Sequence, residues 1–153
     1  MSVLASIPIH PLLVHVPVVM LPLAALGAIA LVVRPRWVQH YGWLVVAGAV
    51  VAFGGSFLAA GSGDDLMEQY QNSGQHISKT LSTHADLGGA VQWVALLFLA
   101  LVASWVWLRK RQFGKPVVRT VLSVLVVLSA VAATAMVVEA GHNGATAKWE
   151  QTK

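Results

Sequence analysis

The run IHPLLVHVPVVMLPLAALGAIALVV, residues 9–33, decides the fold class of this chain. It contains no charged side chain, and its only strongly polar groups are His10 and His15. About 20 consecutive apolar residues are enough to cross a hydrocarbon core roughly 30 Å thick. The run is too long for the apolar part of a signal peptide and has no basic segment before it. We therefore expect a retained membrane span that its prolines kink.

Three further apolar runs follow, at about residues 41–61, 85–108 and 116–140. Gly61-Ser62-Gly63 predicts a break after the second run, and Gly141 predicts a C-cap after the fourth. Hydrophobic residues make up 57% of the 153 residues and charged residues only 10%, whereas a soluble domain has about 25% charged residues. The sequence thus predicts one domain, residues 1–153, that is all-α: an integral membrane antiparallel four-helix bundle surrounded by lipid.

The charges predict the orientation of the bundle. Two basic residues follow the first run and five lie around the turn between the third and fourth: Arg34 and Arg36, then Arg109, Lys110, Arg111, Lys115 and Arg119. The acidic residues all lie toward the other end: Asp64, Asp65, Glu68, Asp86, Glu139 and Glu150. Basic loops mark the cytoplasmic side, so we expect a multi-pass protein of a bacterial inner membrane with both termini periplasmic.

Aromatic and basic residues agree with this placement. Five aromatic residues are expected to form a belt at the cytoplasmic interface: Trp37, Tyr41, Trp43, Trp105 and Trp107. The basic clusters beside apolar runs are typical of membrane-protein loops, so the net charge of +4 does not predict nucleic-acid binding.

Four of the six histidines gather near the periplasmic interface in this topology: His10, His15, His84 and His142. His76 lies in the outer connection and could join them, while His40 lies alone on the cytoplasmic side. Spans one and three are diagonal in an up-down-up-down bundle, so His15 and His84 are predicted to face each other across the core. Two such imidazoles can hold a haem iron from both sides.

The other polar groups are given supporting roles. His10 and His142 are expected to form a second ligand pair or to hydrogen-bond the haem propionates or a ligating imidazole. Asp86 and Glu139 are interpreted as groups that support the ligands rather than as ligands. The sequence thus predicts a small membrane protein that binds haem b through a periplasmic-side histidine cluster, for electron transfer.

Two alternatives stay open. One is a periplasm-facing copper, zinc or iron site without porphyrin, held by the same four histidines; the absence of cysteine rules out thiolate ligands. The other is a cofactor-free structural or assembly subunit whose histidines only make hydrogen bonds between helices. No hydrolytic triad or phosphate-binding loop is present, so the pattern favours electron transfer or metal binding over an enzyme. A redox partner or a homo-oligomer fits each alternative.

Three motifs resemble one family. They are Ile9-His10-Pro11-Leu12-Leu13-Val14-His15-Val16-Pro17, His84-Ala85-Asp86-Leu87-Gly88 and Gly141-His142-Asn143-Gly144-Ala145. Together they resemble the bacterial predicted membrane proteins catalogued as domain of unknown function 2231, over essentially the whole chain. The resemblance implies a four-span membrane domain that is sometimes fused to, or encoded with, cytochrome-like modules. That association favours haem or redox work and implies no specific activity.

Overall fold

The computed structural model of the chain describes residues 9–74 and 77–150, and the described elements are helical. In chain order these are α1 (Ile9–Leu13), α2 (His15–Val33), the short 3₁₀ helix η2 (Pro35–Trp37), α3 (Val38–Asn72), α4 (Lys79–Lys110) and α5 (Pro116–Glu150). Four of the helices are long and apolar enough to cross a membrane. The structure thus agrees with an all-helical membrane bundle.

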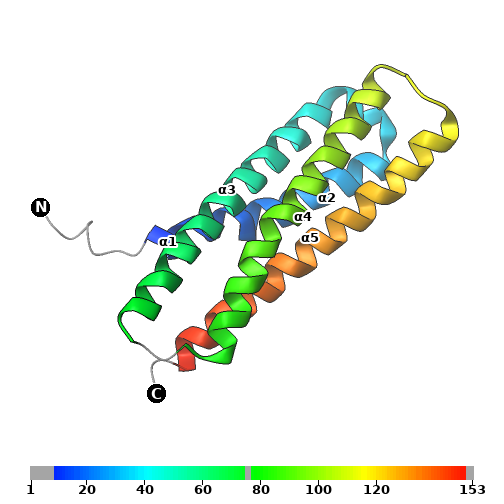
Figure 1. Ribbon diagram of the computed structural model, residues 1–153. Coiled ribbons are helices and arrows are strands. Elements are labelled where there is room, and N and C mark those ends of the chain that lie inside the picture. Colours follow the sequence, from blue (N-terminus) through cyan, green and yellow to red (C-terminus); the bar gives the residue numbers. More distant parts are fainter. Residues whose placement is uncertain (1–8, 75–76, 151–153) are drawn as a thin grey trace, which may run out of the picture.

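The four long helices pack side by side, and each contacts two others (Figure 1). α2 and α4 both pack against α3 and α5, which makes α2 and α4 diagonal in the bundle. The α2–α3 and α4–α5 connections lie at one end of the bundle, here called the basic end because it carries the two basic clusters (Figure 1). The end of α3, the start of α4 and the end of α5 lie at the other end, here called the acidic end (Figure 1).

The first apolar run forms two helices, separated at Val14. Pro17 explains the separation: a proline has no N–H to donate to the carbonyl four residues earlier, and its ring clashes with that carbonyl. The carbonyl in question belongs to Leu13, the last residue of α1. The break lets α1 leave the line of α2 and pack against α3 (Figure 1). Because of this break, His10 and His15 are carried by different helices.

The core consists of small residues and a few large ones. The largest fully buried side chains are Trp105 and Phe98 of α4 and Leu21 and Leu31 of α2. Trp105 is only 1% exposed, so the expectation that it belongs to the interfacial aromatic belt was wrong. The indole Nε1–H of Trp105 donates to the hydroxyl of Ser123 at 2.7 Å, which satisfies its one polar group inside the bundle. The remaining belt residues are exposed: Trp37, Tyr41, Trp43 and Trp107.

Small residues let α2 and α3 approach closely. Gly55 of α3 is buried, and a Cβ atom built on it would lie 2.8 Å from Cβ of Val16. Ala52 and Ala59, on the same face, are also buried. These small residues therefore form a packing face of α3.

Two predicted helix ends were wrong. α3 continues through Gly61-Ser62-Gly63 to Asn72, and α5 continues past Gly141 to Glu150. A glycine lowers helix stability by only about 1 kcal/mol, which is less than packing along a long bundle supplies. At a rise of about 1.5 Å per residue, the 35 residues of α3 span roughly 52 Å. α3, α4 and α5 therefore extend well past the roughly 30 Å of a hydrocarbon core and beyond α2 at the acidic end (Figure 1).

Candidate functional site

A cavity of about 480 Å³ lies between the helices toward the acidic end. Residues from α1, α2, α3, α4 and α5 line it, and the lining is mostly apolar. The space exists because many of the lining residues are small: Ala59, Ala60, Gly63, Gly88, Gly89, Ala140, Gly141 and Gly144. The volume falls within the roughly 300–1,000 Å³ typical of small-molecule and cofactor sites. Two imidazoles, those of His10 and His84, contribute to its lining.

His10, on α1, is fixed by the backbone of α3. Its Nδ1 lies 3.1 Å from the carbonyl oxygen of Ala59 and 2.9 Å from Oγ of Ser62. The Ser62 hydroxyl itself donates to the Ala59 carbonyl. Since a carbonyl oxygen only accepts hydrogen bonds, Nδ1 carries the proton, and Nε2 of the neutral ring keeps its lone pair. One turn further along α3, Gly63 gives the ring room: a Cβ atom there would lie 3.0 Å from Cε1 of His10.

His84, on α4, is fixed in the same way by α5. Its Nδ1 donates to the carbonyl of Ala140 at 2.8 Å, which again leaves the Nε2 lone pair free in the neutral ring. A Cβ atom at Gly144 would lie 2.8 Å from Cε1 and 2.9 Å from Nδ1 of this ring. Each imidazole is thus held by an alanine carbonyl and a glycine four residues later on the neighbouring helix.

The two rings meet across the bundle. Their centroids lie 6.2 Å apart, and the ring planes are inclined by 79°. We call His10 and His84 the histidine pair. A metal-ligating histidine usually donates its other ring N–H to a carbonyl or carboxylate, which fixes the tautomer and the ring orientation. Both members of the pair already have this support.

The predicted pairing of His15 with His84 differs from this arrangement. His15 is exposed and lies outside the cavity lining, and its Nδ1 is hydrogen-bonded to the carbonyl of Pro11, four residues earlier on α1. Five residues separate His10 from His15, and this spacing turns a side chain by about 140° around a continuous helix. One of the two therefore faces away from the core, and with the break at Val14 it is His15.

The remaining predicted residues also lie outside the cavity lining. His142, Glu139 and Asp86 are exposed. His142 stands two residues from both Ala140 and Gly144, or about 200° around the helix from each. The side-chain amide of Asn143 donates to the carbonyl of Glu139. Within the described part of the chain, no hydrogen bond joins the carboxylate of Glu139 or Asp86 to the histidine pair. His76 lies outside the described residues.

Metal-ligating side chains do not gather beyond the pair itself. Within residues 9–74 and 77–150, no three His, Asp or Glu side chains come together closely enough to hold a metal ion. Sequence reasoning also missed the groups that position the pair, Ala59 with Gly63 and Ala140 with Gly144. Their shared signal is an alanine followed four residues later by glycine, which is too common in membrane helices to be noticed without the contacts.

Comparison with known proteins gives one match. No curated protein and no solved structure matches the chain. The model of one family matches residues 6–152, a range that includes every described helix in full. The chain therefore belongs to the family of predicted membrane proteins described as domain of unknown function 2231.

Proposed function

We propose that this protein binds haem b in the cavity between its helices, where His10 and His84 would hold the iron, and that it transfers electrons at one face of the membrane. The observation that carries the proposal is the histidine pair. Each ring donates Nδ1–H to a helix carbonyl and keeps an Nε2 lone pair, and both rings line an apolar cavity of about 480 Å³.

The number of available ligands favours haem over a bare metal ion. Zinc sites in proteins take three or four protein ligands, and only two imidazoles come together in the described part of this chain. A porphyrin supplies four nitrogen ligands of its own and asks the protein for one or two axial ligands. A site with two imidazoles and apolar walls therefore fits haem better than free copper, zinc or iron.

Both imidazoles would hold the iron through Nε2, because Nδ1 of each ring is hydrogen-bonded to a helix carbonyl. Their ring centroids lie 6.2 Å apart. When bound, haem would supply a one-electron couple. The chain's own part is to orient both imidazoles, to keep Nε2 deprotonated by placing the proton on Nδ1, and to exclude water with small apolar residues.

The same proposal includes an orientation. The antiparallel bundle is placed in a bacterial inner membrane with the basic end in the cytoplasm and both termini in the periplasm, because basic connections are retained on the cytoplasmic side. The histidine pair, near the acidic end, then lies toward the periplasm. A periplasmic one-electron carrier protein is the corresponding partner class.

A visible spectrum tests the proposal. Full-length protein purified in detergent, after expression with adequate haem supply, is expected to show a Soret band and a reduced-minus-oxidised α band of a low-spin, six-coordinate haem at one haem per chain. Metal analysis of the same sample distinguishes the bare-metal alternative. Stoichiometric metal without porphyrin, or neither metal nor porphyrin, contradicts the haem proposal.

One observation favours a second candidate, the cofactor-free structural subunit. His10 joins α1 to α3 and His84 joins α4 to α5 through direct hydrogen bonds to the backbone, which are the contacts that a purely structural histidine would make. For this candidate, replacement of either histidine lowers the free energy of unfolding by about 1 kcal/mol, and the purified wild-type protein carries no chromophore.

A further inference from the structure

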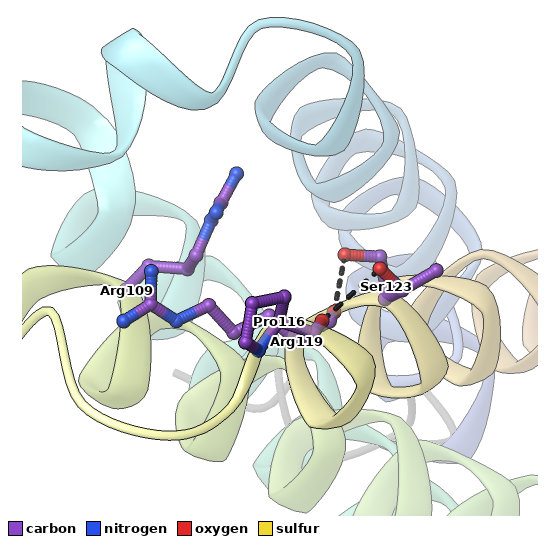
Figure 2. A pocket seen from close by; sticks show the side chains of 5 residues that line it. Arg109, Pro116, Arg119 and Ser123 are labelled. Carbon is purple, nitrogen blue, oxygen red and sulfur yellow. Dashed lines mark hydrogen bonds between the residues drawn. The ribbon is translucent and has the colours of Figure 1, made fainter.

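A second pocket, of about 220 Å³, lies at the basic end, beside the turn that connects α4 to α5 (Figure 2). Its lining consists of Arg109 on α4 and of Pro116, Arg119, Thr120 and Ser123 on α5. We call it the arginine pocket. It lies at the opposite end of the bundle from the histidine pair, and nothing in the proposed haem function uses it.

The two arginines that line the pocket are half-buried and have no carboxylate partner among the described residues. The guanidinium of Arg119 is fixed by the turn before α5: its Nε donates to the carbonyl of Phe113 at 3.1 Å, and its Nη2 donates to that of Gln112. Arginine has five N–H donors, so three remain for a ligand. The acidic residues of the chain all lie toward the other end, so the fixed positive charge has no counter-charge in its surroundings.

The other polar groups of the pocket are already satisfied. Thr120 donates to the carbonyl of Pro116, and Ser123 donates to that of Arg119 while it accepts from Trp105. The pocket therefore offers guanidinium donors and few acceptors. This donor-rich environment suits an oxyanion, because arginine forks match phosphate geometry.

Exposed apolar side chains adjoin the pocket. The rings of Trp107 and Phe113 contact each other edge to face, with centroids 6.4 Å apart, and both are exposed. Val117 and Val121, on the first turns of α5, are also exposed. Trp residues favour the level of lipid headgroups, and apolar faces below them contact acyl chains. A phosphate at this depth, bound beside lipid-facing residues, belongs most simply to a phospholipid.

We infer that the arginine pocket is a binding site for the phosphate of an anionic phospholipid, held by Arg109 and Arg119, with the acyl chains lying along exposed residues of α4 and α5. Basic pockets between membrane helices on the cytoplasmic side bind lipid headgroups in this way. The probe for a test is phosphatidylglycerol, with phosphatidylcholine as the zwitterionic comparison.

The experiment measures lipid binding to the full-length protein by native mass spectrometry, after titration of each lipid into the delipidated detergent sample. One phosphatidylglycerol is expected to bind in preference to phosphatidylcholine. Arg109→Gln is expected to weaken it about tenfold, since a charge-assisted hydrogen bond corresponds to roughly one decade in affinity. Arg109 serves better than Arg119 as the main variant, because its guanidinium lies over the Trp105 ring, 5.5 Å from the centroid, and does not hold the turn.

Arg111→Gln is the matched control: Arg111 is exposed, carries the same charge at the same end, and lies outside the pocket lining. It is expected to change the affinity less than twofold. Arg119→Lys keeps the positive charge but loses the planar set of guanidinium donors. It is expected to weaken phosphatidylglycerol binding as much as Arg109→Gln does. Equal binding of both lipids, or an equal loss in Arg111→Gln, overturns the inference. Displacement of the lipid by millimolar inorganic phosphate overturns the lipid assignment in favour of a free-anion site.

Discussion

Gly144 packs so closely on His84 that a Cβ atom in its place would lie 2.8 Å from Cε1 of the imidazole. On the other half of the bundle, Gly63 stands in the same relation to His10, at 3.0 Å. Both glycines follow, by four residues, the alanine whose carbonyl holds Nδ1 of the same ring. The position of each imidazole is therefore set by two contacts on one helix face: the hydrogen bond to the alanine carbonyl and the close van der Waals contact with the glycine.

Gly144→Ala is expected to lower haem affinity about tenfold, the lower end of the effect of groups that position metal ligands. The added methyl group pushes His84 off its hydrogen bond to Ala140. Titration of haem into the apo-protein, followed at the Soret band, measures the change. Gly141→Ala, on the same helix and also in the cavity lining, is the control because its Cβ would meet no atom within 4 Å. Equal effects of the two substitutions would contradict the positioning role.

Replacement of the histidines one at a time distinguishes the observed pair from the pair predicted from the sequence. His10→Ala and His84→Ala are each expected to convert the low-spin spectrum to a high-spin one and to lower haem content by at least about tenfold. His15→Ala and His142→Ala, at exposed positions, are expected to leave both unchanged. A spectrum lost in His15→Ala but kept in His10→Ala would reverse the ligand assignment.

Gly55→Ala is expected to destabilise the bundle by about 1–3 kcal/mol, the usual effect of overpacking a tight contact. Its Cβ would meet Val16 and, at 3.3 Å, Cδ of Pro17, so α2 and α3 must separate. Thermal unfolding in detergent reports the change. The neighbouring Gly54→Ala, with no atom within 4 Å of its Cβ, should instead be neutral or slightly stabilising. A stability loss shared by both variants would point to helix bending rather than packing.

The orientation can be read from cysteine labelling, because the natural chain has no cysteine. Asn72→Cys at the acidic end and Gln39→Cys at the basic end replace exposed residues. In spheroplasts of a bacterial host, a membrane-impermeant maleimide is expected to label Asn72→Cys at once and Gln39→Cys only after lysis. The opposite pattern would place the histidine pair toward the cytoplasm.

The apolar runs and the separation of charges were sufficient to predict four helices and the two ends of the bundle. The ends of the helices were harder to predict from the sequence, because the effect of a glycine on a helix depends on what packs around it. Gly61 and Gly141 look like helix ends in sequence, yet each lies within a helix that continues past it. The side of the helix on which a histidine lies could have been predicted. The buried face of α5 is marked by Val137, Ala140 and Ala147, and His142 does not lie on that face.

The choice of His10 over His15 required the break at Val14, which only one of the three nearby prolines explains. Pro11 falls in the first turn of α1, where a proline is tolerated. Pro17 ends the helix because it leaves the carbonyl of Leu13 without a donor. The repeated support of the two imidazoles could not be predicted, since a hydrogen bond to a backbone carbonyl has no sequence signature on the accepting side.

The support of the histidine pair also imposes an order on biosynthesis. His10 is among the first described residues to leave the ribosome, whereas Ala140 and Gly144, which hold its counterpart, are among the last. After α4 has been inserted, both imidazoles are present but only His10 has its carbonyl partner in place. Insertion of α5 supplies the other. If the pair binds haem as proposed, loading would follow insertion of α5, and a chain truncated after α4 would reach the membrane with an unfinished site.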